Sequence, residues 1–158
     1  MKKTAVYPGT FDPITNGHID LINRGLAVFD NLIIAVAEKP KKNLLFSTDE
    51  RIDMIRNTVN NDSITIESFN GLLVDYVSEK NSSVIIRGLR AVSDFEYELS
   101  MALMNRNLNP NIETFFMMTS ELYSYLSSGI VREIASLNGS VSGLVPDYVK
   151  ERLKQKFN

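Results

Sequence analysis

The residues best suited to chemistry lie in one turn near the start of the chain. This turn follows a short apolar stretch, opens a helical pattern, and spans residues 7–18 with the sequence YPGTFDPITNGH. Proline and glycine enforce a tight path, and Thr15 is a good N-cap, which places His18 in the first turn of a helix. Unbonded N–H groups and the positive end of the helix dipole meet at such a point. The pattern therefore predicts that His18 shares a bound phosphate with the backbone.

The same motif has a structural alternative. Gly17 would then only allow the chain to turn, and His18 would be a surface or core histidine whose ring nitrogens already have hydrogen-bond partners. Two features favour the functional interpretation, because the motif stands at a strand-to-helix junction and His18 is the only histidine in the chain. We therefore expect a site at this turn.

Cationic side chains follow another apolar stretch. Arg87 and Arg90 flank Gly88, where two guanidinium groups suit an oxyanion and a glycine lets the backbone approach a ligand closely. The alternative for these arginines is an ion pair with Asp94 or Glu98. We expect them to bind an anion.

A lysine cluster and a serine pair could add further donors. Lys39, Lys41 and Lys42 form the kind of charge run that is more often a solvated loop, and only Lys42 need reach inward. Ser127 and Ser128 open a helix whose hydroxyl groups could donate to phosphoryl oxygens. Ordinary helix capping is the alternative for the two serines.

Helix capping separates two kinds of helix start. Residues 47–50 (STDE) and 93–96 (SDFE) match the capping box, in which a glutamate returns to the N-cap amide, so these ends satisfy themselves. The starts at Thr15 and Ser127 instead carry a histidine and an isoleucine at the corresponding position. Because no carboxylate there repels an anion, we expect these two N-termini to hold the phosphates.

Strand and helix signals alternate along the chain. This order predicts an α/β fold with a Rossmann-like, doubly wound sheet of about five parallel strands, helices on both faces and a C-terminal helix. Ligands of such folds bind beyond the carboxyl ends of the strands, where the strand order reverses, and the candidate side chains follow strands. The predicted strands span residues 4–7, 32–37, 64–68, 84–87 and 113–117, and the predicted helices span residues 15–28, 49–60, 72–80, 94–107, 128–137 and 146–157.

Four apolar residues in these helices have two interpretations. Leu72, Leu73, Met101 and Met104 have helical spacing and would by default belong to the core. A minority of them could instead line a slot for an apolar substrate arm.

Length and composition limit the classes of protein. The 158 residues are 44% hydrophobic without a composition break, which predicts one domain over residues 1–158. Seventeen basic and nineteen acidic residues give a net charge of -2, so we expect no nucleic-acid partner. The absence of cysteine excludes disulfides and thiolate chemistry, and a single histidine excludes a multi-histidine metal centre. The longest apolar run, residues 32–37, is too short to span a bilayer, so we expect no membrane partner and a cytoplasmic protein.

The absence of several catalytic motifs limits the possible mechanisms. The eight glycines include neither a P-loop nor a dinucleotide-binding motif. No serine has a credible histidine and carboxylate partner set, and no second histidine can act as a base, so a covalent enzyme intermediate is not expected. Positioning and charge stabilisation remain, which suits direct phosphoryl or nucleotidyl transfer.

Together the motifs resemble those of one family, the bacterial phosphopantetheine adenylyltransferases. A Thr-x-Gly-His step alone would indicate only the wider nucleotidyltransferase superfamily, whereas the block from Arg87 to Glu98 is far more specific, and the resemblance covers essentially the whole chain. Two residues depart from the commonest pattern, because Gly129 replaces a third hydroxyl residue and Tyr123 stands where many members have tryptophan. The matching stretches are residues 9–13, 15–18, 86–98, 104–106 and 127–132.

The resemblance implies an activity and its partners. The activity would be transfer of AMP from ATP to 4'-phosphopantetheine, giving dephospho-coenzyme A and pyrophosphate in coenzyme A biosynthesis, by direct in-line attack. Magnesium would be the cofactor, bound mainly through the ATP phosphates and without metal ligands from the protein. Dephospho-coenzyme A and coenzyme A would bind as product or feedback ligand, and the chain would form a homohexamer.

The resemblance also assigns roles to residues at matching positions. His18, Lys42 and Arg90 would be catalytic, with His18 stabilising the transition state. The contacts to 4'-phosphopantetheine would come from Thr10, Lys42, Leu73, Arg87, Met104 and Asn105. The contacts to ATP would come from Thr10, Phe11, His18, Gly88, Leu89, Arg90, Glu98, Tyr123, Ser124, Tyr125, Leu126, Ser127, Ser128 and Gly129.

Three other classes of protein are compatible with parts of the pattern. A nucleotidyltransferase could act on another phosphate, such as nicotinate mononucleotide or glycerol phosphate, although residues 87–98 favour phosphopantetheine. The chain could be a noncatalytic nucleotide-binding module, against which the presence of Thr10, His18, Lys42 and Arg90 argues. A truncated aminoacyl-tRNA synthetase core shares the Gly-His step, but the chain lacks a Lys-Met-Ser-Lys-Ser loop and a basic surface for tRNA.

Overall fold

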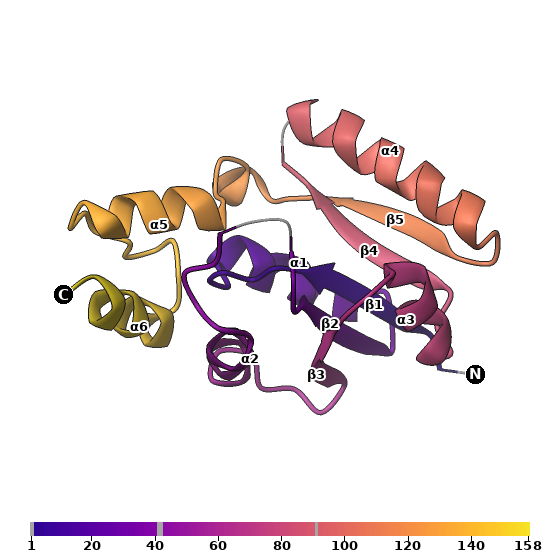
Figure 1. Cartoon of the computed structure of the whole chain (residues 1–158), viewed down its shortest axis with the longest axis horizontal. Helices are drawn as coiled ribbons and strands as arrows, with labels where there is room; N and C mark the ends of the chain where they lie inside the picture. Colours follow the sequence, from indigo (N-terminus) through magenta and orange to yellow (C-terminus); the bar gives the residue numbers. More distant parts are fainter. Residues whose placement is uncertain (1, 41–42, 91) are drawn as a thin grey trace.

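A parallel sheet forms the centre of the molecule (Figure 1). The computed structural model describes residues 2–40, 43–90 and 92–158, and within them five strands have the order β3-β2-β1-β4-β5. All neighbouring strands run parallel, which confirms the predicted Rossmann-like α/β fold. The strands are β1 (Thr4–Gly9), β2 (Asn31–Ala37), β3 (Ile64–Phe69), β4 (Val84–Leu89) and β5 (Glu113–Met118).

Helical structure follows each strand, as predicted, and a final helix lies near the end of the chain (Figure 1). Helix α2 ends at Arg56, before the predicted residue 60, and its last turn tightens, since the backbone N–H of Thr58 donates to the carbonyl of Ile55, three residues back, at 3.1 Å. Within the described ranges, no helix has the length and apolar content needed to cross a membrane. The helices are α1 (Asn16–Leu26), α2 (Thr48–Arg56), α3 (Leu73–Glu79), α4 (Val92–Leu108), the 3-10 helix η1 (Glu121–Tyr123), α5 (Ser128–Ser136) and α6 (Asp147–Phe157).

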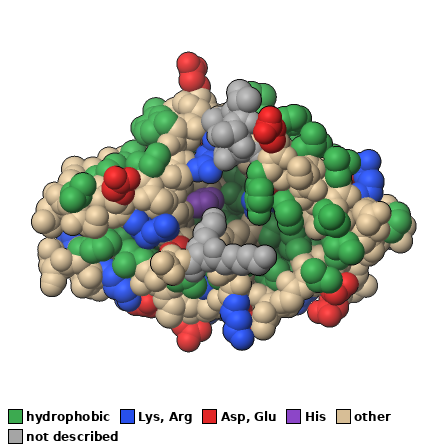
Figure 2. All heavy atoms as spheres, turned by 45° about the horizontal axis from the view of Figure 1, so that its top comes forward, with side chains coloured by type: hydrophobic (Ala, Val, Ile, Leu, Met, Phe, Trp, Pro, Cys, Tyr) green, Lys and Arg blue, Asp and Glu red, His purple; other side chains and the backbone are tan. Residues whose placement is uncertain are grey.

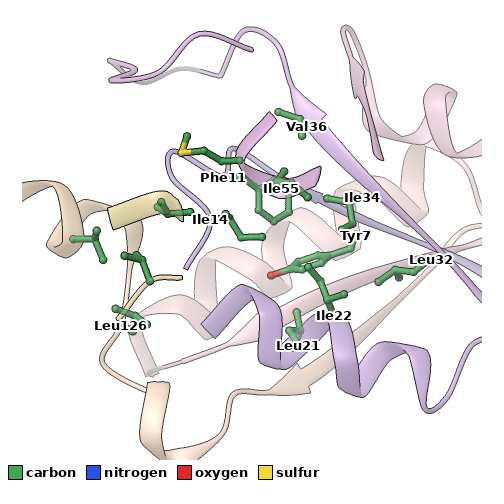
Figure 3. Packing of buried hydrophobic residues seen from close by; sticks show 14 of the residues in the cluster. Tyr7, Phe11, Ile14, Leu21, Ile22, Leu32, Ile34, Val36, Ile55 and Leu126 are labelled. Carbon is green, nitrogen blue, oxygen red and sulfur yellow. The ribbon is translucent and has the colours of Figure 1, made fainter. Parts of the chain in front are cut away.

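Alternating side chains of the strands enter two hydrophobic layers. On β1, Ala5 belongs to one layer and Val6 to the other, as expected for a strand that is buried on both faces. The first layer takes in side chains from α1, α2, α5 and α6, and Figure 3 shows part of it. The second layer contains Val74 and Val77 of α3. Helices therefore cover both faces of the sheet, as the sequence predicted.

Helix α4 differs from the others because its apolar side chains are spread around the helix. Met101 is 42% exposed and Met104 is 53% exposed, and Leu72, just before α3, is also exposed. The default expectation that these three residues belong to the core is wrong, and of the four residues considered only Leu73 packs against a core layer. A helix with apolar residues on all sides exposes surface that another molecule can cover.

The central strands β1 and β4 have a short ladder. Over these two strands, which the structure describes completely, only Val6 and Ile85 are in register, whereas β1 pairs with β2 from Thr4 to Gly9. A side chain adds a bond at the start of the junction, where the Ser82 hydroxyl donates to the Thr4 carbonyl at 2.9 Å. We call the junction of β1 and β4 the seam.

Candidate active site

The predicted site residues follow the carboxyl ends of the two strands that flank the seam. The chain proceeds outward from β1 to β3 and then adds β4 and β5 on the other side of β1, so the strand order reverses at the seam. Ligands of doubly wound sheets bind at such a reversal. Thr10 and His18 follow β1, and Arg90 follows β4. Figure 2 shows a hollow in the surface with the only histidine of the chain beside it and lysine or arginine side chains nearby.

His18 closes the capping box of its own helix. Thr15 is the N-cap of α1, as predicted, and its backbone N–H donates to His18 Nδ1 at 2.9 Å. The expectation that this helix start lacks a capping box is therefore wrong, because an imidazole nitrogen accepts the bond that a glutamate usually accepts. The bond assigns the neutral tautomer, with the hydrogen on Nε2. This second ring nitrogen is a donor that can face a ligand.

The surroundings of His18 keep its ring uncharged. The ring centroids of Phe11 and Tyr7 lie 4.9 Å and 6.4 Å from that of the imidazole. Burial lowers the pKa of His18 from 6.5 to about 3, and the positive charges of Arg90 and Arg87 act in the same direction. At neutral pH, His18 is therefore an N–H donor beside two cations and carries no charge itself.

Arg87 links β4 to β1 and α4. Its Nε donates to Glu98 Oε2 at 2.8 Å, and a terminal nitrogen donates to the carbonyl of Pro8 at 2.8 Å. The ion pair with Glu98, which the sequence left as the alternative, is thus present. Glu98 is only 8% exposed, so water screens this pair less than a surface pair. A phosphate that binds Arg87 would have to share the guanidinium with Glu98.

The start of α5 lies close to the end of β4. Arg90 donates to the carbonyl of Leu126 at 3.1 Å, directly before the N-cap Ser127. The Ser127 hydroxyl accepts a backbone N–H of the first turn at 3.2 Å, and the Ser128 hydroxyl donates to the carbonyl of Pro13 at 2.7 Å. Ordinary capping therefore accounts for Ser127. A phosphate at this helix would meet the backbone N–H groups of its first turn.

Two glycines show which elements lie against one another. A Cβ atom on Gly17 would lie 3.5 Å from the Cβ of Tyr123, so the start of α1 lies against residues 123–126, which were predicted to hold ATP. A Cβ atom on Gly88 would lie 3.4 Å from the side chain of Leu21. The sequence predicted that a ligand approaches the backbone at Gly88, whereas the neighbour that its missing side chain faces is Leu21 of α1.

The segment between β5 and α5 combines buried and exposed side chains. Tyr123 packs against the first hydrophobic layer, and Leu126 is buried within it (Figure 3). The Ser124 hydroxyl turns back to the carbonyl of Glu121 at 3.0 Å. Tyr125 is 61% exposed, so its ring is open to a ligand. Leu126 can meet a ligand only through its backbone.

Three of the residues predicted to bind the acceptor lie on other helices. Leu73 begins α3, and Met104 and Asn105 lie in the second half of α4, which contacts α3 (Figure 1). Lys42, predicted to be catalytic and to bind the acceptor, lies outside the described residues. The capping box predicted at residues 93–96 also depends on side chains that the structure does not describe, those of residues 93 and 94. The described part of the predicted acceptor set therefore extends from the seam to α4.

Two buried charged residues were not predicted as site residues. Asp12 is 1% exposed and accepts the N–H groups of Leu45 and Phe46, both at 2.9 Å. Arg51 is buried in α2 and donates to the carbonyl of Thr10 at 2.8 Å. The signal for Arg51 was its helical spacing, three and four residues before two buried apolar positions of α2, which places it on the core face.

The site offers hydrogen-bond donors rather than metal ligands. Among the residues that the structure describes, no group of three or more His, Cys, Asp or Glu side chains could hold a metal ion. The nearby carboxylate of Asp12 already accepts two backbone N–H groups and lies 3.6 Å from the guanidinium of Arg132. Such a donor set suits the oxygens of a phosphate.

The chain is similar to named proteins over nearly its whole length. A family model described as Cytidylyltransferase-like matches residues 6–134. The phosphopantetheine adenylyltransferase of Geobacter metallireducens is 58% identical over 158 residues, which cover 99% of this chain and 97% of that protein. The phosphopantetheine adenylyltransferase of Geotalea daltonii is 59% identical over 157 residues, which cover 99% of this chain and 98% of that protein.

A solved structure shares the fold. It is a Vibrio parahaemolyticus protein described as a candidate nicotinate-nucleotide adenylyltransferase, and it matches with a TM-score of 0.73 over 98% of this chain and 93% of that chain. The two sequences are 16% identical, so the match supports the fold and says nothing about the substrate.

Proposed function

The chain belongs to the phosphopantetheine adenylyltransferases, which are nucleotidyltransferases, and on that basis we propose that it transfers AMP from ATP to 4'-phosphopantetheine. Family membership confirms the resemblance found in the motifs. The products would be dephospho-coenzyme A and pyrophosphate, which places the reaction in coenzyme A biosynthesis. The observation that carries the proposal is the similarity to named phosphopantetheine adenylyltransferases over nearly the whole chain, and the geometry of His18, whose Nε2–H is fixed as a donor near two arginines at the seam, supports the transfer chemistry.

The charges of the reactants explain why the mechanism needs no base. The phosphate of 4'-phosphopantetheine is ionised at neutral pH, so its oxygen can attack the α-phosphorus of ATP directly. A bond forms between that oxygen and the α-phosphorus, and the bond to the bridging oxygen of pyrophosphate breaks in line. The Nε2–H of His18 and the guanidinium of Arg90 would stabilise the charge that accumulates on the α-phosphate.

The remaining contacts follow from the family motifs. Thr10, directly after β1, would meet both reactants, while Lys42 and Arg87 would orient the attacking phosphate. The pantetheine arm would extend toward α3 and α4. ATP would lie against residues 88–90 and 123–129, and coenzyme A would bind as a feedback ligand.

Magnesium would enter the site with the nucleotide. The described side chains offer donors without a carboxylate cage, so they fit a polyphosphate that carries its own cation better than a dedicated metal centre. When bound, magnesium would neutralise part of the ATP charge. His18, Arg90 and Thr10 would orient the phosphates.

The assembly that the family resemblance implies is a homohexamer in the cytoplasm. The exposed apolar surface of α4 supports an assembly, because a second copy of the chain could cover it, and Figure 2 shows hydrophobic side chains gathered on this face of the molecule. Light scattering should then give six times the chain mass of 17.8 kDa. The exposed residues of α4 include Phe95, Tyr97, Leu99, Met101, Leu103 and Met104.

A direct assay tests the activity. The purified protein is incubated with ATP, magnesium and 4'-phosphopantetheine, and dephospho-coenzyme A is sought by mass spectrometry. Nicotinate mononucleotide and glycerol phosphate, each with ATP or CTP, test the choice of acceptor. We expect product only with 4'-phosphopantetheine and ATP. No product with any pair, together with no ATP formed from pyrophosphate and dephospho-coenzyme A, would indicate a noncatalytic module.

A further inference from the structure

Arg51 of α2 is a fully buried arginine whose hydrogen-bond acceptors are neutral oxygens. Burying a guanidinium is unfavourable unless hydrogen bonds compensate for the lost water. The negative charge of Asp12 is close enough to favour the charged form, but its carboxylate already accepts two backbone N–H groups. We therefore infer the role of Arg51 from the two backbone carbonyl groups to which it donates.

Arg51 joins β1 and β2 just beyond the end of their ladder. The last pair in register is Gly9 with Val36. One terminal nitrogen of Arg51 donates to the carbonyls of Thr10 and Ala37, each at 2.8 Å and each one residue beyond that pair. The side chain thus continues the ladder at the edge of the sheet where the site lies.

The Thr10 carbonyl is directly connected to the surroundings of His18. It belongs to the same peptide unit as the nitrogen of Phe11, whose φ of 51° is uncommon for a residue with a side chain. Such conformations persist where the surrounding structure holds them. The buried Phe11 ring lies 4.9 Å from the imidazole, centroid to centroid. A shift of the Thr10 carbonyl would therefore move the ring that packs against His18.

We propose that Arg51 is a positioning residue for the transfer reaction, which fixes the Thr10–Phe11 peptide and, through it, the direction of the His18 Nε2–H. Its kinetic test rests on the proposed function, whereas the position of the His18 ring can be measured in the free protein. A displacement of about 1 Å can lower a rate about 100-fold without contact to the reacting atoms. The kcat should therefore respond more strongly than KM.

Three variants test this role. Arg51→Lys keeps the charge but loses the planar fork, and Arg51→Met removes both. Thr48→Val leaves Arg51 in place and removes the hydroxyl that accepts from its other terminal nitrogen at 3.0 Å. For Arg51→Lys we expect kcat to fall about tenfold or more while KM for ATP changes less than about threefold. Thr48→Val should have a smaller effect in the same direction, and each variant should shift the NMR resonances of the single imidazole without substrates.

Met54→Ala is the matched control, because Met54 is equally buried on the same helix and carries no donor. It should lower the melting temperature while kcat and the His18 resonances stay nearly unchanged below that temperature. Normal kcat and unshifted resonances in Arg51→Lys would overturn the proposal, as would equal effects of Met54→Ala. If both Arg51 variants fail to fold, Thr48→Val decides in the same way. If the wild type makes no dephospho-coenzyme A, the proposed function fails, and the resonances alone decide the role of Arg51.

Discussion

The helix starts of α1 and α5 lie near the same seam but differ in their first turns. In α1, the third helical residue is His18, whose Nδ1 accepts the N-cap N–H. In α5 the same position is Ile130, and the cap is made by the Ser127 hydroxyl. The sequence predicted both starts as phosphate sites on the same grounds. A side chain that closes the cap is also held in one direction, so α1 offers a directed imidazole donor in addition to its backbone.

Removal of His18 should produce the largest effect. We expect His18→Ala to lower kcat about 100-fold or more with a smaller change in KM for ATP, because the donor acts mainly in the transition state. His18→Gln is the matched variant, since a glutamine at this position can still accept the N-cap N–H. Its unfolding free energy should stay near that of the wild type while its kcat falls. A near-normal kcat in His18→Ala would contradict the role of His18.

Acidification should reveal how much neutral His18 contributes to the stability of the folded protein. Its pKa is lowered from 6.5 in the unfolded chain to about 3 in the folded protein, so the unfolded state binds more protons between these values. The stabilising contribution of neutral His18 is therefore present above pH 6.5 and lost as the pH falls toward 3. In urea unfolding from about pH 7.5 to about pH 4, the wild type should lose more stability than His18→Gln. Equal losses in the two proteins would show that His18 titrates normally.

Substitution of the α5 cap should mainly affect stability. Ser127→Ala removes the acceptor for an N–H group of the first turn, and we expect a loss of about 1 kcal/mol in the free energy of unfolding. The kcat should stay within about twofold of the wild type, since other donors hold the transition state. Ser47→Ala at the start of α2 is a control with a similar expected loss, because Ser47 caps its helix in the same way. A tenfold loss of kcat in Ser127→Ala alone would mean that its hydroxyl contacts the phosphates.

Addition of a hydroxyl to α5 should give the smallest effect. A Cβ atom at Gly129 would lie 3.7 Å from Ser127 Oγ, an ordinary contact, so a serine fits there. Gly129→Ser should lower KM for ATP by up to about fivefold, the value of one added hydrogen bond, and leave KM for 4'-phosphopantetheine unchanged. Equal changes in both values would place the new hydroxyl away from the nucleotide.

The order and type of the elements were predictable because strand and helix periods differ along the chain. The predicted helix from Thr15 ends two residues early, at Leu26, since helix ends are set by local caps. The side chains of α4 were harder to place. Met101 and Met104 have helical spacing, but their exposure depends on what covers the helix, and the sequence of one chain does not encode that.

The site was predictable where its chemistry is local and not where it is long-range. The Thr15 cap and the place of His18 follow from adjacent residues. Arg51 and the Thr10 carbonyl are 41 positions apart in the chain, and only the parallel order of β1 and β2 brings them together. The pair of Arg87 and Glu98 stood only as an alternative in the sequence, because its geometry depends on how α4 packs on β4.

The seam has a mechanical consequence for the sheet. Backbone ladders stiffen β3-β2-β1 and β4-β5, whereas in the fully described strands β1 and β4 only Val6 and Ile85 are in register. We therefore expect this junction, which Arg87 and Ser82 also bridge by side-chain hydrogen bonds, to be less stiff than either ladder. Deuterium should reach amides along β1 and β4 before those between β1 and β2. This result would make the sheet most compliant where the two reactants would meet.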